Sequence, residues 1–228
     1  MDDRPRAKPP EPGGGKAGRT CLGMTRRTLL LGAGGAAAML GLGGIRYAAA
    51  QPVIRPPGGQ DEDRLVAACI RCEKCYEICP RDVIAPARIE KGVLAMRTPT
   101  FDFSRSWCDW CAEENGGDPL CARSCPTEAL RLAPGATPGN TVIGKAAINE
   151  DWCLAYKLIG CRFCYDACPY GALSLDGNGR PEVVEDACNG CGACESVCVS
   201  LQAGSISEGA DARAIVVHPI DELERRLS

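Results

Sequence analysis

The apolar residues of this chain form one continuous run near its start and several short segments further on. The long run extends from Thr28 to Ile45 without a charged residue, but six of its 18 positions are glycine. A weakly hydrophobic run of that length is at the short end for a membrane span. Beyond residue 50 the apolar segments are only three or four residues long, and they are separated by prolines, glycines and cysteines. This pattern indicates short elements joined by many turns.

Several short segments have the composition of extended chain. They are residues 82–84, 141–143, 146–148, 182–184 and 214–217. The pair around Gly144 and Lys145 has the pattern of a hairpin turn. Pro80 precedes the first segment and is expected to end a short helical turn. Residues 221–227 have the pattern of a charged amphipathic end.

Cysteine spacing is the strongest signal in the sequence. Sixteen of the 17 cysteines fall into four runs of four. The first and fourth runs have two, two and three residues between successive cysteines, whereas the second and third contain longer inserts. The runs are Cys69, Cys72, Cys75, Cys79; Cys108, Cys111, Cys121, Cys125; Cys153, Cys161, Cys164, Cys168; and Cys188, Cys191, Cys194, Cys198.

The compact spacing is that of bacterial ferredoxins, in which three cysteines of one run bind a [4Fe–4S] cluster and the fourth binds a second cluster. Each run therefore needs a partner run. Four runs predict four [4Fe–4S] clusters, with all sixteen cysteines as iron ligands. Three runs end in Cys-Pro, but the last ends in Cys198-Val199. We expect the local backbone to differ there without loss of the ligand.

Zinc and disulfides are the alternative uses of so many cysteines. Zinc sites pair two Cys-x2-Cys knuckles about 15–20 residues apart and have no need for a third and fourth cysteine so close by. Cysteines within one compact run are poorly placed for disulfides with each other. A c-type haem requires histidine after Cys-x2-Cys, and the single histidine, His218, follows no such pair.

Two ways of pairing the runs are open. We expect nested pairing, because the two compact runs are outermost and the two runs with inserts are innermost. Sequential pairing, first with second and third with fourth, is the alternative. Nested pairing groups the cysteines as Cys69, Cys72, Cys75, Cys198; Cys188, Cys191, Cys194, Cys79; Cys108, Cys111, Cys121, Cys168; and Cys153, Cys161, Cys164, Cys125.

Composition supports a fold held by clusters. Aromatic residues make up only 5% of the 228 residues, which leaves a thin apolar core, and metal ligation then contributes to folding. The expected fold class is α+β: small tandem or nested bacterial-ferredoxin-like units with short helices and strands and much loop. Residues 51–228 carry 18 basic and 26 acidic side chains, which argues against binding to nucleic acid.

The N-terminal region has the layout of an export signal. Residues 1–24 are rich in proline, glycine and charge and are expected to be disordered. Arg26-Arg27 precedes the apolar run, and Ala48 to Ala50 resembles a cleavage site, a layout typical of a twin-arginine signal. A membrane anchor is the alternative. Export of a folded protein with its clusters already loaded would protect the thiols from oxidation in the new compartment.

The predicted domain organisation follows from these segments. Residues 1–50 contain the disordered start and the twin-arginine signal, and residues 51–64 are a polar, proline-rich linker. Residues 65–206 form the four-cluster domain, and residues 207–228 form a tail. The insert at residues 112–120 is expected to be a loop. Aromatic residues beside the ligands, Trp107, Trp110, Phe163 and Tyr165, are expected to shield clusters from water.

With these motifs in place, the chain resembles the NapG/MauM ferredoxin-type proteins over roughly residues 25–206. The resemblance rests on the twin-arginine signal, the segment Ile54 to Gly58, CIRCEKCYEICP, the longer spacings of the middle runs and CNGCGACESVC. It implies a periplasmic or membrane-associated protein with four [4Fe–4S] clusters. It also implies a membrane quinol-oxidising donor (NapH-like) and a cytochrome or molybdoenzyme as acceptor.

The expected function is electron transfer, without a catalytic site in this chain. The committed cysteines and the single histidine leave little for nucleophilic chemistry, and we expect the chain to act as a component of a quinol dehydrogenase-type system. One alternative is the iron–sulfur subunit of a molybdopterin oxidoreductase complex. The other is a structural metal-binding protein without a redox cycle.

Overall fold

A computed structural model of the chain describes residues 52–203, 207 and 209–220, together with residues 32, 34, 35 and 37. The chain divides into two compact units, Met1–Gly44 and Ile45–Ser228. The twin-arginine signal, most of the apolar run and the amphipathic end at 221–227 lie outside the described residues, so these expectations remain predictions. Within the described residues, no helix has both the length and the apolar character that a membrane crossing requires.

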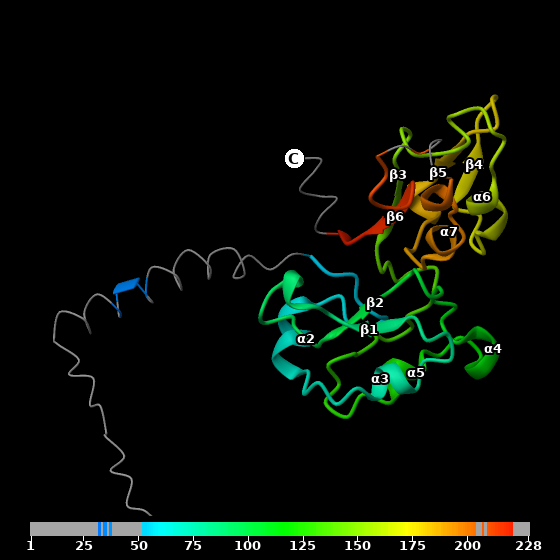
Figure 1. Ribbon diagram of the computed structural model, residues 1–228. Coiled ribbons are helices and arrows are strands. Elements are labelled where there is room, and N and C mark those ends of the chain that lie inside the picture. Colours follow the sequence, from blue (N-terminus) through cyan, green and yellow to red (C-terminus); the bar gives the residue numbers. More distant parts are fainter. Residues whose placement is uncertain are drawn as a thin grey trace, which may run out of the picture. The chain divides into compact units, whose positions relative to one another are not determined.

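The first half of the second unit (residues 52–132) contains the first two cysteine runs. Its only two-stranded sheet in the described residues pairs β1 with β2 in antiparallel register, with Ile84 opposite Phe101 (Figure 1). The helices are one or two turns long. In chain order the elements are α2 (Glu62–Ala68), α3 (Lys74–Glu77), β1 (Ile84–Pro86), η1 (Ile89–Lys91), β2 (Pro99–Phe101), α4 (Ala112–Asn115) and α5 (Leu120–Arg123).

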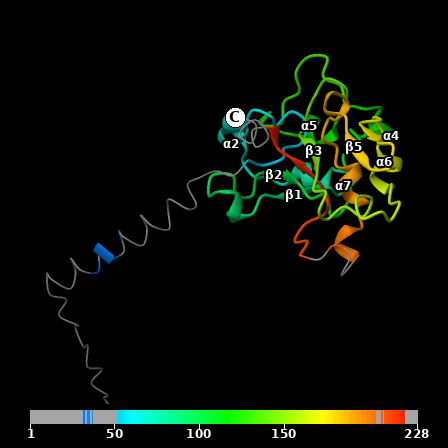
Figure 2. The same cartoon turned by 90° about the horizontal axis from the view of Figure 1, so that it is seen from above.

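The second half (residues 133–220) repeats this plan around the third and fourth runs. Strand β3 pairs with β6 and β4 pairs with β5, both antiparallel. The helices α6 and α7 pack against each other and lie side by side in both ribbon views (Figure 2). The elements are β3 (Lys145–Ile148), α6 (Phe163–Ala167), β4 (Leu173–Leu175), β5 (Pro181–Val183), η2 (Glu185–Ala187), α7 (Ala193–Ser196), η3 (Ser200–Gln202) and β6 (Ile215–His218).

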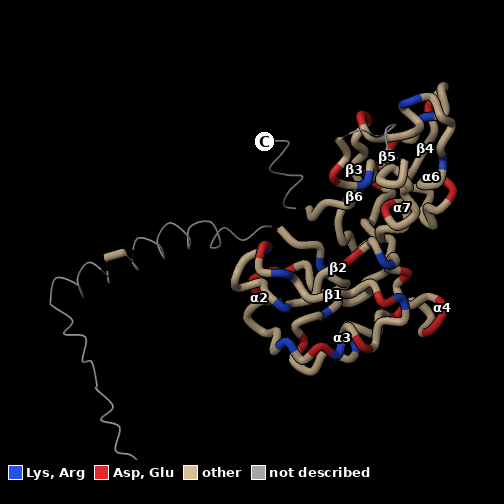
Figure 3. The backbone as a smooth tube through the Cα atoms, in the orientation of Figure 1, with Lys and Arg blue, Asp and Glu red and all other residues tan. Residues whose placement is uncertain are grey.

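The expected α+β class with short elements and much loop is confirmed. The main hydrophobic cluster mixes aliphatic side chains such as Leu65, Val83 and Ile215 with the cysteines themselves. Acidic and basic residues are intermixed over the second unit in Figure 3, and several form ion pairs, such as Arg162 with Asp166. The interior therefore consists of cysteine side chains as well as aliphatic and aromatic ones.

Residues 52–64 form part of the packed structure, in contrast to the expected linker. Arg55 is 3% exposed and donates to Thr98 Oγ1 at 2.8 Å and to the Pro99 carbonyl at 2.7 Å, and it also pairs with Glu62. A buried guanidinium held by three partners fixes the segment against β2. The polar and proline-rich composition that suggested a linker instead supplies these buried contacts.

The expected hairpin at residues 141–148 is wrong. Strand β3 (Lys145–Ile148) pairs with β6, 70 residues further along, and residues 141–143 form no strand. Gly144 therefore lies directly before β3 and not in a hairpin turn, and a Cβ there would lie 2.6 Å from the His218 carbonyl oxygen. The strands expected at 182–184 and 214–217 are confirmed with a shift of about one residue, as β5 and β6.

The insert at residues 112–120 is only partly the expected loop. Its first four residues form α4, a single helical turn, and Gly116 and Gly117 then reverse the chain with positive φ values of 61° and 84°. Pro119 precedes α5, which carries Cys121. The insert therefore returns the third cysteine of this run to the same region as the first two.

Candidate iron–sulfur sites

The structure brings the sixteen cysteines together in four sites. Each site takes three cysteines from one run and the last cysteine of the neighbouring run. In three of the sites the four cysteines line one recess in the protein. In the other, the second in chain order, the cysteines lie close enough to raise one another's pKa. The first site is Cys69, Cys72, Cys75, Cys125; the second Cys79, Cys108, Cys111, Cys121; the third Cys153, Cys161, Cys164, Cys198; the fourth Cys168, Cys188, Cys191, Cys194.

These groups show that nested pairing is wrong and that the runs pair sequentially. Helix α3, which carries Cys75, packs against α5, which carries Cys121, and α6 packs against α7 in the same way. In each half a short antiparallel sheet joins the end of one run to the start of the next, β1 with β2 and β4 with β5. Such local connections favour pairing of neighbours in the chain.

The spacing of the thiols does not fit disulfides or a single zinc ion. All sixteen cysteines are free. In the described residues, which include all of them, no three cysteine sulfurs lie within 4.8 Å of one another. Four thiolates around one zinc ion, at about 2.3 Å each, would be closer than that. The wider arrangement fits a multi-iron cluster.

Left-handed backbone positions shape the sites. The residue before the second cysteine has positive φ in all four runs: Arg71 at 56°, Trp110 at 60°, Gly160 at 66° and Gly190 at 81°. Left-handed residues reverse the local direction of the chain, and successive amides then point toward one concave side. Such a concavity suits an anionic sulfur cluster, so the compact spacing and the backbone conformation serve the same group.

The Cys-Pro turns have a common geometry. The third residue after the last cysteine has positive φ at Asp82 (49°), Glu128 (53°) and Gly171 (61°). In the run that ends in Cys198-Val199, the chain instead enters the 3-10 helix η3 (Ser200–Gln202). The expectation that the backbone differs where proline is absent is therefore confirmed, and Cys198 still reaches the third site.

Backbone amides donate to several of the thiols. Ala172 N lies 3.2 Å from Cys168 Sγ, and Ala146 N lies 3.4 Å from Cys188 Sγ. For Cys125, burial raises the pKa, but the amides of Leu130 and Thr127 together with other donors outweigh it, and the pKa falls below its usual value. These contacts favour the thiolate, which is the form that binds iron.

Most of the other buried thiols have raised pKa values. Burial is the largest cause, and neighbouring cysteines add to it: the pKa of Cys75, of Cys164 and of Cys191 rises to about 12. Without cations, four closely grouped thiols cannot all ionise in such a site. Iron would supply the positive charge that makes four thiolates stable there, so the donor set fits a cluster.

Two polar side chains that cysteine spacing does not reveal hold the backbone of the second and fourth runs in place. Asp109 Oδ1 accepts from Cys111 N at 2.9 Å, and Asn189 Oδ1 accepts from Cys191 N at 3.1 Å. Both residues directly follow the first cysteine of their run, and both are buried. Aspartate or asparagine at this position is a signal in the sequence, because these side chains bond to the amide two residues on.

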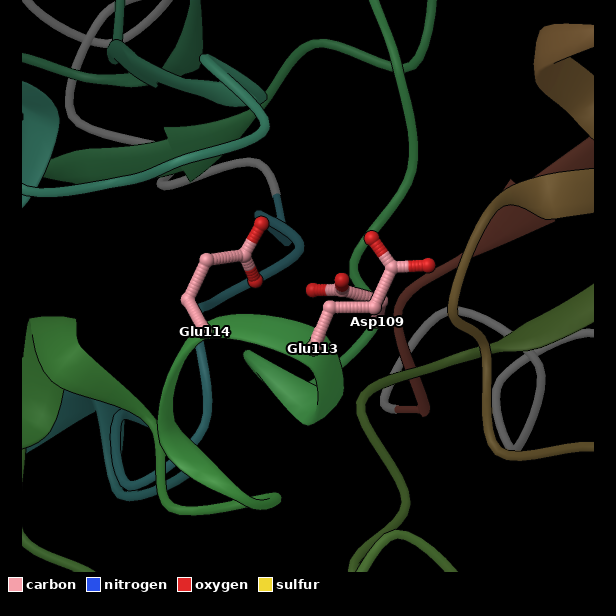
Figure 4. Close-up of side chains that lie close together, drawn as sticks. All are labelled: Asp109, Glu113 and Glu114. Carbon is pink, nitrogen blue, oxygen red and sulfur yellow. The ribbon is translucent and has the colours of Figure 1, made fainter.

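Asp109 also belongs to an acidic group with Glu113 and Glu114 at the start of α4, shown in Figure 4. Arg81 lies among these carboxylates, with its Nε 2.8 Å from Asp109 and an Nη 3.7 Å from Glu113. The guanidinium also stacks over Trp107, 5.2 Å from the ring centre. The group is therefore an ion-pair cluster that joins the Cys79-Pro80 turn to the second run.

The aromatic residues beside the ligands differ in burial. Trp110 is fully buried, and its Nε1 finds no acceptor in the described part of the chain. Phe163 is 56% exposed and lines the third site, and Tyr165 beside it is 38% exposed. Shielding from water is thus possible for Trp110, whereas the outer edge of the third site is open to the surface.

Comparison with known proteins agrees with this arrangement. The family model described as a 4Fe-4S dicluster domain matches residues 159–200, and that of a 4Fe-4S binding domain matches residues 69–83. The ferredoxin-type protein NapG of Escherichia coli (strain K12) is 33% identical over 191 residues, covering 77% of this chain and 80% of NapG. This chain belongs to the NapG/MauM family of ferredoxin-type proteins. It is an iron–sulfur electron-transfer protein.

Other NapG/MauM members are similarly related. The methylamine utilization ferredoxin-type protein MauM of Methylorubrum extorquens is 36% identical over 160 residues, covering 66% of this chain and 70% of MauM. MauM of Paracoccus denitrificans is 34% identical over 194 residues, covering 77% and 84%. The dicluster match begins after Cys153 and includes Cys161 to Cys198, so it covers most of the third run and the whole fourth run, in agreement with sequential pairing.

Proposed function

We propose that this protein carries four [4Fe–4S] clusters and relays electrons from a membrane-bound, NapH-like quinol-oxidising partner to a periplasmic cytochrome or reductase. The observation that carries the proposal is the set of four sites, each made of three cysteines from one run and one from its neighbour. Each cluster would supply a one-electron redox centre. The sixteen cysteines would hold the clusters, and the amides near the thiols would influence their potentials.

The chemistry of the sites supports a relay and offers no separate catalyst. Every cysteine of the described residues belongs to one of the four sites, so none remains as a nucleophile. Acidic residues beside the sites are ion-paired: Asp109 and Glu113 with Arg81, and Glu73 with Arg97. An electron-transfer role requires only that the protein hold, space and partly shield its redox groups.

Two of the sites have residues exposed at the surface. In the first, Cys72 is exposed and its neighbour Ile70 is 63% exposed. In the third, Phe163 is exposed, and Leu158 in the nearby insert is 80% exposed. Electron exchange between proteins requires a redox group near the surface. These two edges are therefore the surfaces where a donor and an acceptor would meet the relay.

Location outside the cytoplasmic membrane rests on the N-terminal sequence. Arg26-Arg27 followed by an apolar run is the layout of a twin-arginine signal, a route that permits export after cofactor loading. Replacing Arg26 and Arg27 by lysine should retain the protein in the cytoplasm with its clusters intact. Cell fractionation checks this, and unchanged export of the variant would contradict the twin-arginine route.

A reductive titration of the anaerobically purified protein tests the relay. Stepwise addition of dithionite should bleach the visible absorbance and produce low-temperature EPR signals of four reduced clusters. Stable absorbance under a strong reductant would favour a structural metal-binding protein. Membrane vesicles containing the quinol-oxidising partner should reduce the clusters when a quinol is added. Constant association with a molybdenum-containing subunit would instead favour a subunit of a molybdopterin oxidoreductase complex.

A further inference from the structure

The two halves of the second unit meet between the second and the fourth sites. Cys108 N donates to the Cys191 carbonyl at 2.9 Å. Cys108 belongs to the second site and Cys191 to the fourth. One peptide hydrogen bond therefore connects a ligand residue of one half directly to a ligand residue of the other.

Side-chain packing closes the same junction. The ring of Phe103, which is 4% exposed, lies against Gly192, where a Cβ would be only 2.1 Å from the Phe103 Cδ1 atom. Arg213 from the second half donates to the Phe103 carbonyl at 2.9 Å. Gly192 stands between Cys191 and Cys194, so the first half is packed directly onto the fourth cysteine run.

Tyr170 lies at this junction as well. It lines the recess of the fourth site beside Cys168 and Cys191. Burial raises the pKa of Tyr170, the Asn189 side chain lowers it, and Cys191 and Cys108 raise it further. The phenol thus lies near thiols of both inner sites.

Within each half, the two sites lie close enough for a thiol of one to affect a thiol of the other. Cys75 in the first site raises the pKa of Cys121 in the second. In the same way, Cys164 in the third site raises the pKa of Cys194 in the fourth. Together with the Cys108–Cys191 contact, these relations give one continuous series. The series is not the order of the runs in the chain.

We propose that electrons cross between the halves at the Cys108–Cys191 contact, so that the sites act in the order first, second, fourth, third, with Tyr170 positioning the inner pair. The inference rests on the proposed four-cluster relay. Each crossing oxidises the group held at one inner site by one electron and reduces the group at the other by one electron. No bond is formed or broken, and no proton is transferred.

Ligand variants test the order through magnetic coupling between reduced clusters, which weakens steeply with distance. Cys111→Ser, in the second site, should change the EPR line shapes of the first-site and fourth-site clusters. Cys161→Ser should disturb the third-site signal itself and, among the other three, change only the fourth-site signal. A change of the third-site signal in Cys111→Ser, or an unchanged fourth-site signal there, would overturn the proposed order.

Tyrosine variants provide a test that does not depend on ligand loss. Tyr170→Phe removes one hydroxyl and should shift the midpoint potentials of both the second-site and fourth-site clusters in an EPR-monitored titration. The control is Tyr76→Phe, since Tyr76 lies beside Cys75 and donates to the Arg97 carbonyl at 2.8 Å. It should shift the first-site potential alone.

The outcomes separate this inference from the relay on which it rests. If Tyr170→Phe shifts neither inner potential, or only one, the positioning role of Tyr170 is wrong. If the unaltered protein has fewer than four reducible clusters, the proposed function itself is wrong. Four reducible clusters with coupling in a different order would contradict only the route across the junction.

Discussion

The first and fourth cysteine runs have the same spacing and the same left-handed backbone at two positions. The residues at these two positions differ between the runs. In the fourth run, Gly190 and Gly192 have φ values of 81° and 83°. In the first run the equivalent residues, Arg71 and Glu73, have φ values of 56° and 66°. Left-handed backbone strains residues other than glycine, yet the first run tolerates it twice.

Neighbouring atoms explain the difference. A Cβ at Gly190 would lie 2.4 Å from backbone atoms of Gly144, and one at Gly192 would lie 2.1 Å from the Phe103 ring. Arg71 and Glu73 face solvent more openly, and Arg71 Nε donates to the Met96 carbonyl at 2.9 Å. Glycine is thus required in the fourth run by close packing, whereas side-chain contacts accompany the strain in the first.

Replacement of the last cysteine of a run should have the largest effect in either half, because it removes a ligand of the neighbouring run's cluster. Cys79→Ser should abolish the cluster of Cys108, Cys111 and Cys121 and leave that of Cys188, Cys191 and Cys194 intact. Iron content should fall by about four atoms per chain, since each cluster contains four. EPR of the reduced variant identifies the missing signal. Cys168→Ser is the matched variant in the second half and should remove the fourth-site signal. Loss of the fourth-site signal in Cys79→Ser would restore nested pairing.

Acidity should affect the two halves unequally. At the fourth site the raised pKa values of Cys191 and Cys194 mean that, in the cluster-free protein, these thiols keep their protons at neutral pH. Cluster assembly must release those protons, so it is favoured as pH rises and opposed as pH falls. The first site has one thiol with a strongly raised pKa, Cys75, but it also includes Cys125, whose pKa is lowered. Reconstitution between pH 6 and 9 (about the range that spans an ordinary thiol pKa) should lose the fourth-site EPR signal at a higher pH than the first. The reverse order would show that these thiols do not control assembly.

Glycine substitution tests the role of packing. Gly192→Ala should destabilise the protein by about 2–5 kcal/mol, because backbone strain of about 1–2 kcal/mol is added to a clash with Phe103. Gly171→Ala is the control, since Gly171 also has positive φ (61°) but a Cβ there would meet no atom within 4 Å. It should cost only about 1–2 kcal/mol. Anaerobic thermal or denaturant unfolding measures both. Equal losses of unfolding free energy in the two variants would mean that the positive φ alone, and not packing, explains glycine in the fourth run.

The smallest effect is expected in the first run. Arg71→Gly relieves backbone strain but removes the hydrogen bonds from Arg71 to the Met96 and Leu94 carbonyls. These terms oppose each other, and the net change in unfolding free energy should be below about 1 kcal/mol. The same unfolding measurement applies. A loss comparable with that of Gly192→Ala would contradict the comparison.

Cysteine spacing defined the four runs, but it did not predict how the runs pair. The α+β class, β6 and the altered backbone after Cys198 followed from local pattern. The pairing did not, because insert length says little about which runs close a sheet together. A repeated feature did carry that information: a strand begins five residues after both Cys79 and Cys168, and each pairs with the strand that leads to the next run.

Long-range contacts were beyond local pattern. Strand β3 finds its partner 70 residues away, which no turn signal specifies. Arg55 looked like a linker residue because burial of a guanidinium depends on partners such as Thr98 that are distant in the chain. The junction at Cys108, Gly192 and Tyr170 likewise depends on how two separately formed halves meet.

The central claim is that sixteen thiolates hold iron–sulfur clusters in four sites. Its most direct test is the iron and acid-labile sulfide content of the protein purified anaerobically from iron-replete cells. The claim predicts about 16 iron and 16 sulfide per chain, because four [4Fe–4S] clusters contain that number. A folded, colourless protein without iron, or one holding zinc in its place, would contradict it.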